Sequence, residues 1–384
     1  MTPSSAHSWI EISRSALLAN ARHFQAQLAP KATLLPVLKS NAYGHGMELV
    51  ARMLAEDGCR WFGLFSAEEA LRLSALPELV DPRFLVFSFV PPELLAPLVR
   101  AGGRATLFDF EQMAELEAAA AAAGLRAPVH AKLETGLHRQ GFREEELDEL
   151  APRLSACPHL KLEGIYTHFA NIEDTTDHSY AYAQMERFRR ARVKLAEAGL
   201  SPELVHASCS AAGILFPEMH LDLLRVGISL YGHWSSRETR VSAQAAGRNR
   251  IDLRPALSWK TRILHIKRVP AGSMVGYGCS WKAEADTRIG VLPVGYFDGY
   301  DRGLGAAHVL VRGHRAPLRG RIMMNHCLVD LGHIPDARRG DEVVLIGRQG
   351  SEQVTAELLA ELTGTINYEI LSRLGPHLPR VAMD

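Results

Sequence analysis

The sequence lacks the features that mark several large classes of protein. Lys plus Arg and Asp plus Glu both number 43, so the net charge is zero and no excess of one sign attracts nucleic acid or an acidic membrane. No stretch approaches the roughly 20 apolar residues that a membrane helix needs. The opening MTPSSAHSWIEIS has no basic segment followed by an apolar run, so no signal peptide is expected. We therefore expect a cytoplasmic protein without nucleic-acid or membrane partners.

Cysteine pairs and metal-ligand patterns are also missing. The five cysteines are scattered without a CxxC pair, which favours free thiols in a reducing compartment: Cys59, Cys157, Cys209, Cys279 and Cys327. No GxGxxG opens a helix after the first apolar run, and GxxxxGK[ST], GxSxG and HExxH are absent. None of the 17 histidines pairs with a carboxylate at ligand spacing. We expect no metal site.

The first 235 residues or so contain a repeated pattern. Eight short apolar runs each precede a helical or loop segment, at 32–38, 61–65, 83–87, 105–108, 127–133, 160–166, 203–207 and 223–228. Repeated β–α units favour a parallel sheet, and eight of them favour a closed (β/α)₈ TIM-like barrel. An open doubly wound sheet stays an alternative.

The pattern changes after residue 235. Segment 235–252 is polar, lacks apolar periodicity and is interpreted as a linker or an exposed loop. Beyond it, short β-rich runs predict a C-terminal mostly-β domain with one clear helix, TAELLAELTG. The alternating SWIEIS at 8–13 can pair with that domain. The expected division is an N-terminal strand at 1–12, a barrel at 13–240 and a β domain at 241–384.

Polar and charged residues follow the predicted strands at one rim of the barrel, where barrel enzymes carry their chemistry. Lys39, in PVLKSNAYGHG, follows the first strand. Burial lowers a lysine pKa and makes the amine a nucleophile toward a carbonyl, which fits the aldehyde of pyridoxal phosphate (PLP). A lysine with a buried stem and a solvated head is the structural alternative.

Other rim residues raise the weight of the cofactor hypothesis. They are Lys132, Arg139, His168, Ser210, Arg225, Gly227 and Ile228. Ser210, Gly227 and Ile228 follow the last two strands, where barrels bind phosphate. Each residue taken alone also has a structural explanation, as a turn glycine, a core histidine or one half of an ion pair.

Eight segments in order resemble the alanine racemase family: PVLKSNAYGHG, HAKLETGLHRQGF, LEGIYTHFANIED, LLRVGISLYG, VGYGCSW, GYFDGYDRGLG, GRIMMNHCLVDL and INYEILSRLGPHLPRV. The resemblance covers nearly the whole chain. It implies a barrel with a C-terminal β domain, PLP as cofactor and interconversion of L- and D-alanine. Departures from the family pattern are Cys209, Glu134, Asn325 with His326, and a long connector at 233–252.

The resemblance also implies residue roles. Lys39 would bind PLP and act as one base, and Tyr277 would act as the other base on the opposite face of a planar intermediate. Phosphate contacts would come from Tyr43, Ser210, Gly227, Ile228 and Tyr368. His168 would lie behind the cofactor ring, and Arg225 would face its nitrogen and keep it unprotonated. Arg139 and Met324 would bind the substrate carboxylate, with Lys132 as a possible carbamylated lysine that orients Arg139.

The resemblance further implies a homodimer in which each Tyr277 completes the partner's site, and a supply of D-alanine for peptidoglycan. A broad-specificity or serine racemase on the same scaffold is the main alternative. A PLP-dependent decarboxylase fits less well because of Arg225 and the Tyr277 turn. A non-catalytic PLP carrier fits less well because such carriers lack the β domain and Tyr277.

Overall fold

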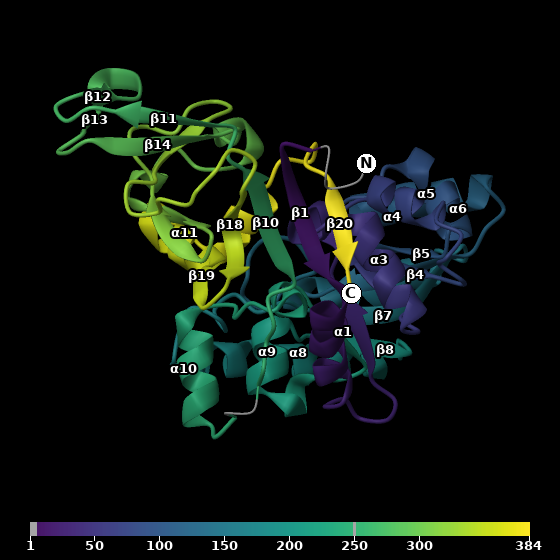
Figure 1. The fold of residues 1–384 in the computed structure, drawn as a ribbon. Helices are drawn as coiled ribbons and strands as arrows, with labels where there is room; N and C mark the ends of the chain where they lie inside the picture. The colour runs from purple at the N-terminus through teal and green to yellow at the C-terminus, as the bar shows by residue number, and fades with distance from the viewer. Residues whose placement is uncertain (1–5, 249–250) are drawn as a thin grey trace. The chain divides into compact units, whose positions relative to one another are not determined.

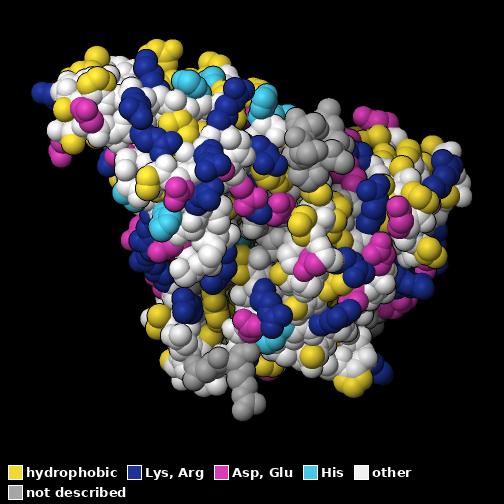
Figure 2. Space-filling view, in the orientation of Figure 1, with side chains coloured by type: hydrophobic (Ala, Val, Ile, Leu, Met, Phe, Trp, Pro, Cys, Tyr) yellow, Lys and Arg dark blue, Asp and Glu magenta, His cyan; other side chains and the backbone are white. Residues whose placement is uncertain are grey.

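The computed structural model describes residues 6–248 and 251–384, which form two compact units. Of these residues, the barrel unit holds 16–40, 50–248 and 251–255. The β-rich unit holds 6–15, 41–49 and 256–384. Segment 41–49 therefore groups with residues far from it in sequence. Figure 2 shows acidic and basic side chains mixed over the face in view.

The barrel unit is built on parallel strands that agree closely with the eight predicted runs. They are β2 (Thr33–Pro36), β3 (Trp61–Leu64), β4 (Arg83–Val86), β5 (Gly103–Leu107), β6 (Ala127–Lys132), β7 (Leu160–Tyr166), β8 (Leu204–His206) and β9 (Leu223–Val226). Six of them form one ladder from β3 to β8 in chain order, and β2 pairs with β9. Their near-continuous apolar sequence suits strands covered on both faces.

Contacts at two junctions join these ladders into a ring. At one junction the parallel bridge between Val37 and Gly63 links the end of β2 to β3. At the other the N–H of Asp222 donates to the carbonyl of Val205 (2.9 Å) and the N–H of Arg225 to that of Ser208 (3.3 Å). The predicted (β/α)₈ barrel is confirmed, and the open doubly wound sheet is excluded.

One helix, α1, precedes the first barrel strand, and helices follow most of the others. They are α1 (Arg14–Gln25), α2 (Lys39–Tyr43), α3 (Met47–Glu56), α4 (Ala67–Ser74), α5 (Pro92–Arg100), α6 (Phe110–Ala122), α7 (Leu147–Ser155), α8 (Ser179–Glu197), α9 (Ser210–Leu215) and α10 (Arg237–Ala245). Side-chain caps start several of them: Ser66 accepts from the N–H of Glu69, and Asp109 from that of Gln112. The TIM-barrel rule then puts functional loops at the C-terminal strand ends.

Helix α10 corrects one expectation. Segment 235–252 was expected to be a linker or loop, but Arg237–Ala245 is helical. The hydroxyl of Ser236 caps the helix by accepting from the N–H of Thr239 (2.9 Å), and Thr239 and Ala243 are buried four residues apart. The prediction failed because threonine and alanine make an inner face without large apolar residues. Positions 249–250 of this segment lie outside the described residues.

The β-rich unit holds the second set of strands. They are β1 (Ser8–Ser13), β10 (Leu257–Arg262), β11 (His265–Val269), β12 (Met274–Val275), β13 (Trp281–Lys282), β14 (Thr287–Leu292), β15 (His308–Val311), β16 (His314–Pro317), β17 (Cys327–Asp330), β18 (Glu342–Gln349), β19 (Glu352–Val354) and β20 (Arg380–Met383). The main sheet runs β16-β15-β18-β10-β1-β20, so the two ends of the chain are neighbouring strands (Figure 1).

Two helices accompany these strands where one clear helix was expected. They are α11 (Ala356–Thr363), which matches the expected pattern, and α12 (Asn367–Ser372), which carries Tyr368. Smaller sheets β11-β14-β17 and β12-β13 complete the unit. Across the residues that the structure describes, no helix has the length and apolar character needed to cross a bilayer.

Candidate active site

Lys39 stands directly after strand β2, where the backbone takes an unusual form. The next four residues, Ser40–Tyr43, all have φ between 52° and 56°, which makes a left-handed turn. For L-residues this conformation costs roughly 1–2 kcal/mol each, so the surrounding structure must hold it. Backbone strain of this kind clusters at functional sites.

Local hydrogen bonds hold the left-handed turn. The N–H of Gly46 donates to the carbonyl of Asn41 (3.0 Å). The ring Nδ1 of the buried His45 lies 3.1 Å from the carbonyl oxygen of Ala42 and 3.0 Å from that of Tyr43, so this nitrogen carries the proton and donates. The turn is therefore fixed by its own downstream residues.

The Lys39 amine lies in an environment that disfavours its charge. Burial lowers its pKa first, and the nearby Arg139 guanidinium lowers it further, while Glu69 and Glu173 oppose both. Glu69 also accepts a hydrogen bond from the N–H of Ser40 (3.0 Å). A lysine with a lowered pKa has more of the neutral amine that attacks a carbonyl.

Lys132, the last residue of β6, is more strongly perturbed. Its side chain is buried, and burial lowers its pKa to about 7, with Arg139 and Arg225 acting in the same direction and Glu134 against them. The carboxylate of Glu134 meanwhile accepts from the backbone N–H groups of Leu137 (2.7 Å) and Arg139 (3.3 Å). Glu134 thus shapes the loop that presents Arg139.

Arg225 lies on β9 and is only 4% exposed. Its Nη1 is 2.6 Å from Nδ1 of His206, and its Nη2 is close to the carbonyls of Thr167 (2.8 Å) and Ala207 (2.7 Å) and to Nδ1 of His168 (3.2 Å). Nε takes part in none of the hydrogen bonds among the described residues. Burial lowers the pKa of Arg225 to about 10, which still leaves it a cation at neutral pH.

Ser210 and the residues after β9 form a small polar cup. The Ser210 hydroxyl accepts from the N–H of Gly227 (2.9 Å) and from that of Ser229 (3.4 Å), so its own proton stays available to donate. Ile228 follows Gly227 at the start of a 3₁₀ turn, Ile228–Tyr231. His168 follows β7, and burial and the guanidinium of Arg225 hold its pKa well below the usual range, so the imidazole is neutral.

The remaining candidates lie in the β-rich unit. Tyr277 is 71% exposed and Met324 is 55% exposed. Both line a pocket of about 450 Å³ together with Arg302, Arg321 and His326. The glycines on either side of Tyr277 have positive φ, 77° and 72°, a conformation that glycine adopts without the steric cost that a side chain would bring.

Tyr43 and Tyr368 lie together in the same unit. Their ring centroids are 6.0 Å apart. The candidates thus fall into three groups: the barrel-rim cluster, the Tyr43–Tyr368 pair, and Tyr277 with Met324. Lys39 belongs to the barrel unit and Tyr277 to the β-rich unit.

Comparison with known proteins gives the family. The model of the alanine racemase N-terminal domain matches residues 12–234, and that of the alanine racemase C-terminal domain matches residues 256–382. This chain belongs to the alanine racemase family. The two matches together cover both the barrel rim and the Tyr277 pocket.

Individual members of the alanine racemase family are similar over almost the full length. The chain is 38% identical to alanine racemase of Leptospira interrogans over 379 residues, 98% of this chain and 96% of that one. It is 40% identical to alanine racemase of Syntrophobacter fumaroxidans over 371 residues, 96% of each chain. The solved alanine racemase of Streptomyces coelicolor A3(2) matches with a TM-score of 0.91 and 34% identity over 100% of both chains.

Some residues that shape this family member's site escaped the sequence analysis. Inside the barrel they are Arg104, His130 and Glu163, and at the Tyr277 pocket they are Arg302, Arg321 and His326. His130 and Glu163 stand within quoted motifs as a histidine and a glutamate inside parallel strands. That placement is the available signal, because both faces of such strands are normally apolar.

Proposed function

We propose that this protein is a PLP-dependent alanine racemase that interconverts L- and D-alanine with Lys39 and Tyr277 as two bases. The observation that carries the proposal is the family match over both domains, joined to a lysine of lowered pKa at the end of β2. The relatives named above are alanine racemases. Racemisation of alanine is therefore the activity to test first.

The donor set of the barrel rim fits PLP. Lys39 offers a nucleophilic amine, Ser210 a free hydroxyl proton, and Gly227 with Ile228 a short backbone turn for the phosphate. Tyr43 and Tyr368 would add phenol groups to the phosphate, and His168 would lie behind the ring. When bound, PLP supplies a conjugated ring that spreads the negative charge left at Cα after its proton is removed.

The two bases divide the proton work between the faces of the substrate. In the proposal, one of Lys39 and Tyr277 takes the Cα proton from one enantiomer, and the other donates a proton to the opposite face. The proton count of the protein is unchanged after one conversion, because one proton is taken and one is given. General bases of this kind contribute about 10²–10⁴-fold each.

Arg225 would restrain side reactions. Its Nε is the guanidinium nitrogen left over by the hydrogen bonds described above, and it would face the ring nitrogen. A fixed cation there disfavours a proton on that nitrogen, because two adjacent positive charges repel. The ring then withdraws fewer electrons, which favours return of the proton to Cα.

Arg139 and the backbone of Met324 would bind the substrate carboxylate, with Lys132 orienting Arg139. The pKa of about 7 leaves much of the Lys132 amine neutral at neutral pH. A neutral amine adds to carbon dioxide, forming an N–C bond and releasing one proton to give a carbamate. The resulting negative charge would suit a position next to Arg139 and Arg225, the two cations that lower the pKa of Lys132.

We also propose a homodimer in which Tyr277 serves the partner's site. The high exposure of Tyr277 supports this, since a general base works best when the site excludes water. A two-fold dimer would give two equivalent sites. Mixing Lys39→Ala with Tyr277→Phe protein under subunit exchange should restore activity. Proven exchange without recovery would assign each site to one chain.

Racemisation is measured by loss of optical rotation, followed by circular dichroism, with a panel of L-amino acids. Alanine should lose its signal fastest, and a faster reaction of serine would favour the broad-specificity alternative. We further propose a cytoplasmic enzyme whose D-alanine supplies peptidoglycan. Expression should then let a bacterium that requires D-alanine grow without it. A purified holoenzyme inactive on every amino acid tested would refute the proposed function.

A further inference from the structure

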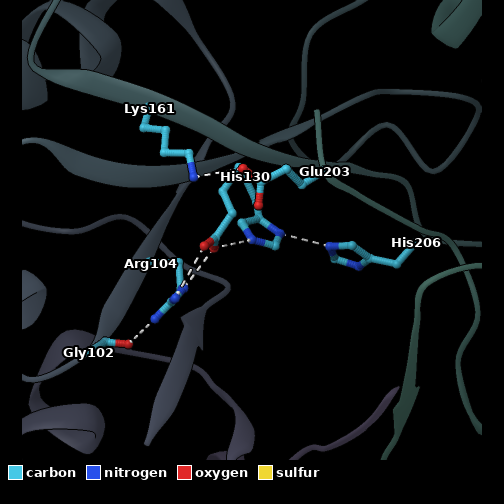
Figure 3. Close-up of polar contacts among 7 residues, drawn as sticks. Gly102, Arg104, His130, Lys161, Glu203 and His206 are labelled. Carbon is cyan, nitrogen blue, oxygen red and sulfur yellow. Dashed lines mark hydrogen bonds and ion pairs between the residues drawn. The ribbon is translucent and has the colours of Figure 1, made fainter. Parts of the chain in front are cut away.

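A continuous series of hydrogen-bonded polar side chains runs through the interior of the barrel unit from Arg225 to Arg104. Nδ1 of His206 is 2.6 Å from Nη1 of Arg225, and its Nε2 is 2.9 Å from Nδ1 of His130. Nε2 of His130 is 3.2 Å from Oε2 of Glu163, which also accepts from Nε of Arg104 (2.7 Å). Figure 3 shows the His130 side chain between those of Arg104 and His206.

The chemistry of the two ends fixes the direction of every hydrogen bond between them. A guanidinium only donates, and a carboxylate only accepts. Nδ1 of His206 must therefore accept from Arg225, which puts the proton of His206 on Nε2. That proton is donated to Nδ1 of His130, whose own proton lies on Nε2 and is donated to Glu163. Both histidines are thus neutral Nε2–H tautomers.

The surroundings favour this arrangement. Both imidazoles are 0% exposed, and burial lowers the pKa of each, that of His206 well below the usual range. The Tyr166 ring stacks on His206 with centroids 4.7 Å apart and a 5° interplanar angle, so the imidazole cannot rotate freely. Gly164 leaves room for His130, because a Cβ there would lie 2.5 Å from Nδ1 of His130.

We propose that Glu163 and His130 are positioning residues that fix the tautomer of His206 and thereby hold the Arg225 guanidinium in place. Neither residue touches the substrate in this proposal, and both act through His206. The inference rests on the proposed function, because holding Arg225 in place affects the reaction only if Arg225 faces the cofactor ring. It adds residues within β6 and β7 to the control of reaction specificity.

The variant Glu163→Gln can reverse the direction of the hydrogen bonds between Glu163 and Arg225. Its side chain has one oxygen acceptor and one NH₂ donor, whereas the site presents donors from both Arg104 and His130. Arg104 donates to both carboxylate oxygens, and His130 faces only Oε2. When the amide oxygen takes the Oε1 position, the NH₂ faces Nε2 of His130, which must then become an acceptor. The His130 proton moves to Nδ1, the proton of His206 moves to its Nδ1, and an N–H then faces Arg225.

The first test measures the ring nitrogens of full-length protein labelled with ¹⁵N-histidine, with and without PLP, by NMR. The wild type should show neutral Nε2–H tautomers at His130 and His206. In Glu163→Gln, the molecules whose amide oxygen takes the Oε1 position should carry the His206 proton on Nδ1. A wild-type His206 that is charged or carries its proton on Nδ1 would overturn the proposal, whatever the stability of any variant.

The second test measures specificity in the holoenzyme. In the side reaction, alanine gives its amino group to the cofactor and leaves as pyruvate, while the cofactor keeps the amine. Pyruvate formed per racemisation turnover should rise about tenfold in Glu163→Gln, the factor carried by one hydrogen bond to a charged group. Gly164→Ala, which displaces the His130 ring without changing a polar group, should raise it in the same direction.

Glu203→Gln is the matched control, because Glu203 pairs with Lys161 on the surface of the same region (2.8 Å, Figure 3). It should leave both the tautomers and the pyruvate ratio unchanged. A pyruvate ratio in Glu163→Gln that does not follow the share of His206 carrying its proton on Nδ1 would overturn the proposal. A wild type without racemase activity would end the proposed function, while the NMR spectra would still decide the tautomers.

Discussion

The barrel rim and the Tyr277 pocket present their functional groups in opposite ways. Lys132 and Arg225 are 3% and 4% exposed, whereas Tyr277 and Met324 are 71% and 55% exposed. The rim groups perturb one another strongly, and Lys132 and Arg225 both have lowered pKa values because burial disfavours their charge. The rim is built by the barrel itself, and the pocket presents groups on an exposed turn.

This difference predicts what substitutions do. A change at the rim alters charge balance, hydrogen bonds and stability together with function. A change at Tyr277 should alter function and leave the fold nearly untouched, because surface substitutions usually shift stability by less than about 0.5 kcal/mol. Variants at the rim should therefore lose stability and function together, and variants at the pocket should lose function alone.

Lys39→Ala should have the largest effect. It removes the proposed link to PLP and one of the two bases, so racemisation should fall by more than about 10⁴-fold, beyond the range of one general base. Borohydride reduction of the wild type followed by peptide mass spectrometry should find PLP on the peptide containing Lys39. Covalently fixed PLP in the reduced Lys39→Ala protein would contradict the assignment.

Tyr277→Phe should come next and test the exposed side. Racemisation should fall about 10²–10⁴-fold, because a phenol that transfers a proton is lost. PLP absorbance and the unfolding temperature should stay close to the wild type, which separates this variant from those at the rim. Tyr296→Phe, at a tyrosine lining the same pocket, serves as the control. Near wild-type racemisation in Tyr277→Phe would rule out the two-base scheme.

Lys132→Met should change how the free energy of unfolding depends on pH, because it removes a buried amine from the rim. The folded-state pKa of about 7 lies below the ordinary value of about 10.4, so the unfolded chain binds more protons between these pH values. Stability of the wild type should therefore rise relative to Lys132→Met across this window, by up to about 1.4 kcal/mol per pH unit, and stay level below it.

Urea unfolding at pH 7 and pH 9 in carbon dioxide-free buffer measures that change. Lys161→Met removes an exposed lysine from the neighbouring strand and controls for loss of a lysine as such. A stability difference between wild type and Lys132→Met that is the same at both pH values would show that the Lys132 amine is not desolvated. Bicarbonate added at pH 8 then tests carbamylation by ¹³C NMR.

The sequence predicts the barrel well because its signal is strong and local. Each strand coincides with an apolar run, and Lys39, Lys132 and Arg225 all lie on or directly after such a run. The hydrogen-bonded series of His206, His130 and Glu163 inside the barrel was missed because a bulge interrupts the alternation of side chains along a strand. Val129 of β6 pairs with Leu162 and the next residue, His130, with Gly164, so Glu163 is an extra residue in β7 that changes the direction in which the later residues of β7 face.

Helices α10 and α12 were missed for a different reason. Both are short, and their buried positions include polar or small residues, such as Thr239 and Ala243 in α10 and Asn367 in α12. Periodicity of large apolar residues is then absent, so only the capping residue signals the start of a helix. In α10 that residue is Ser236, which caps through its hydroxyl.

Ser236→Ala gives the smallest expected effect and tests whether α10 belongs to the barrel rim. Ser236 and Thr239 both donate through their hydroxyls to the carbonyl of Glu173, in the loop that follows His168. Losing the cap should cost about 1 kcal/mol of stability. Because Glu173 also acts on the pKa of Lys39, the KM for alanine should change as well. Gln244→Ala, on the exposed side of the same helix, should change neither. If Ser236→Ala lowers the unfolding temperature while kcat and KM both stay at the wild-type values, α10 supports the fold alone and the rim ends at Glu173.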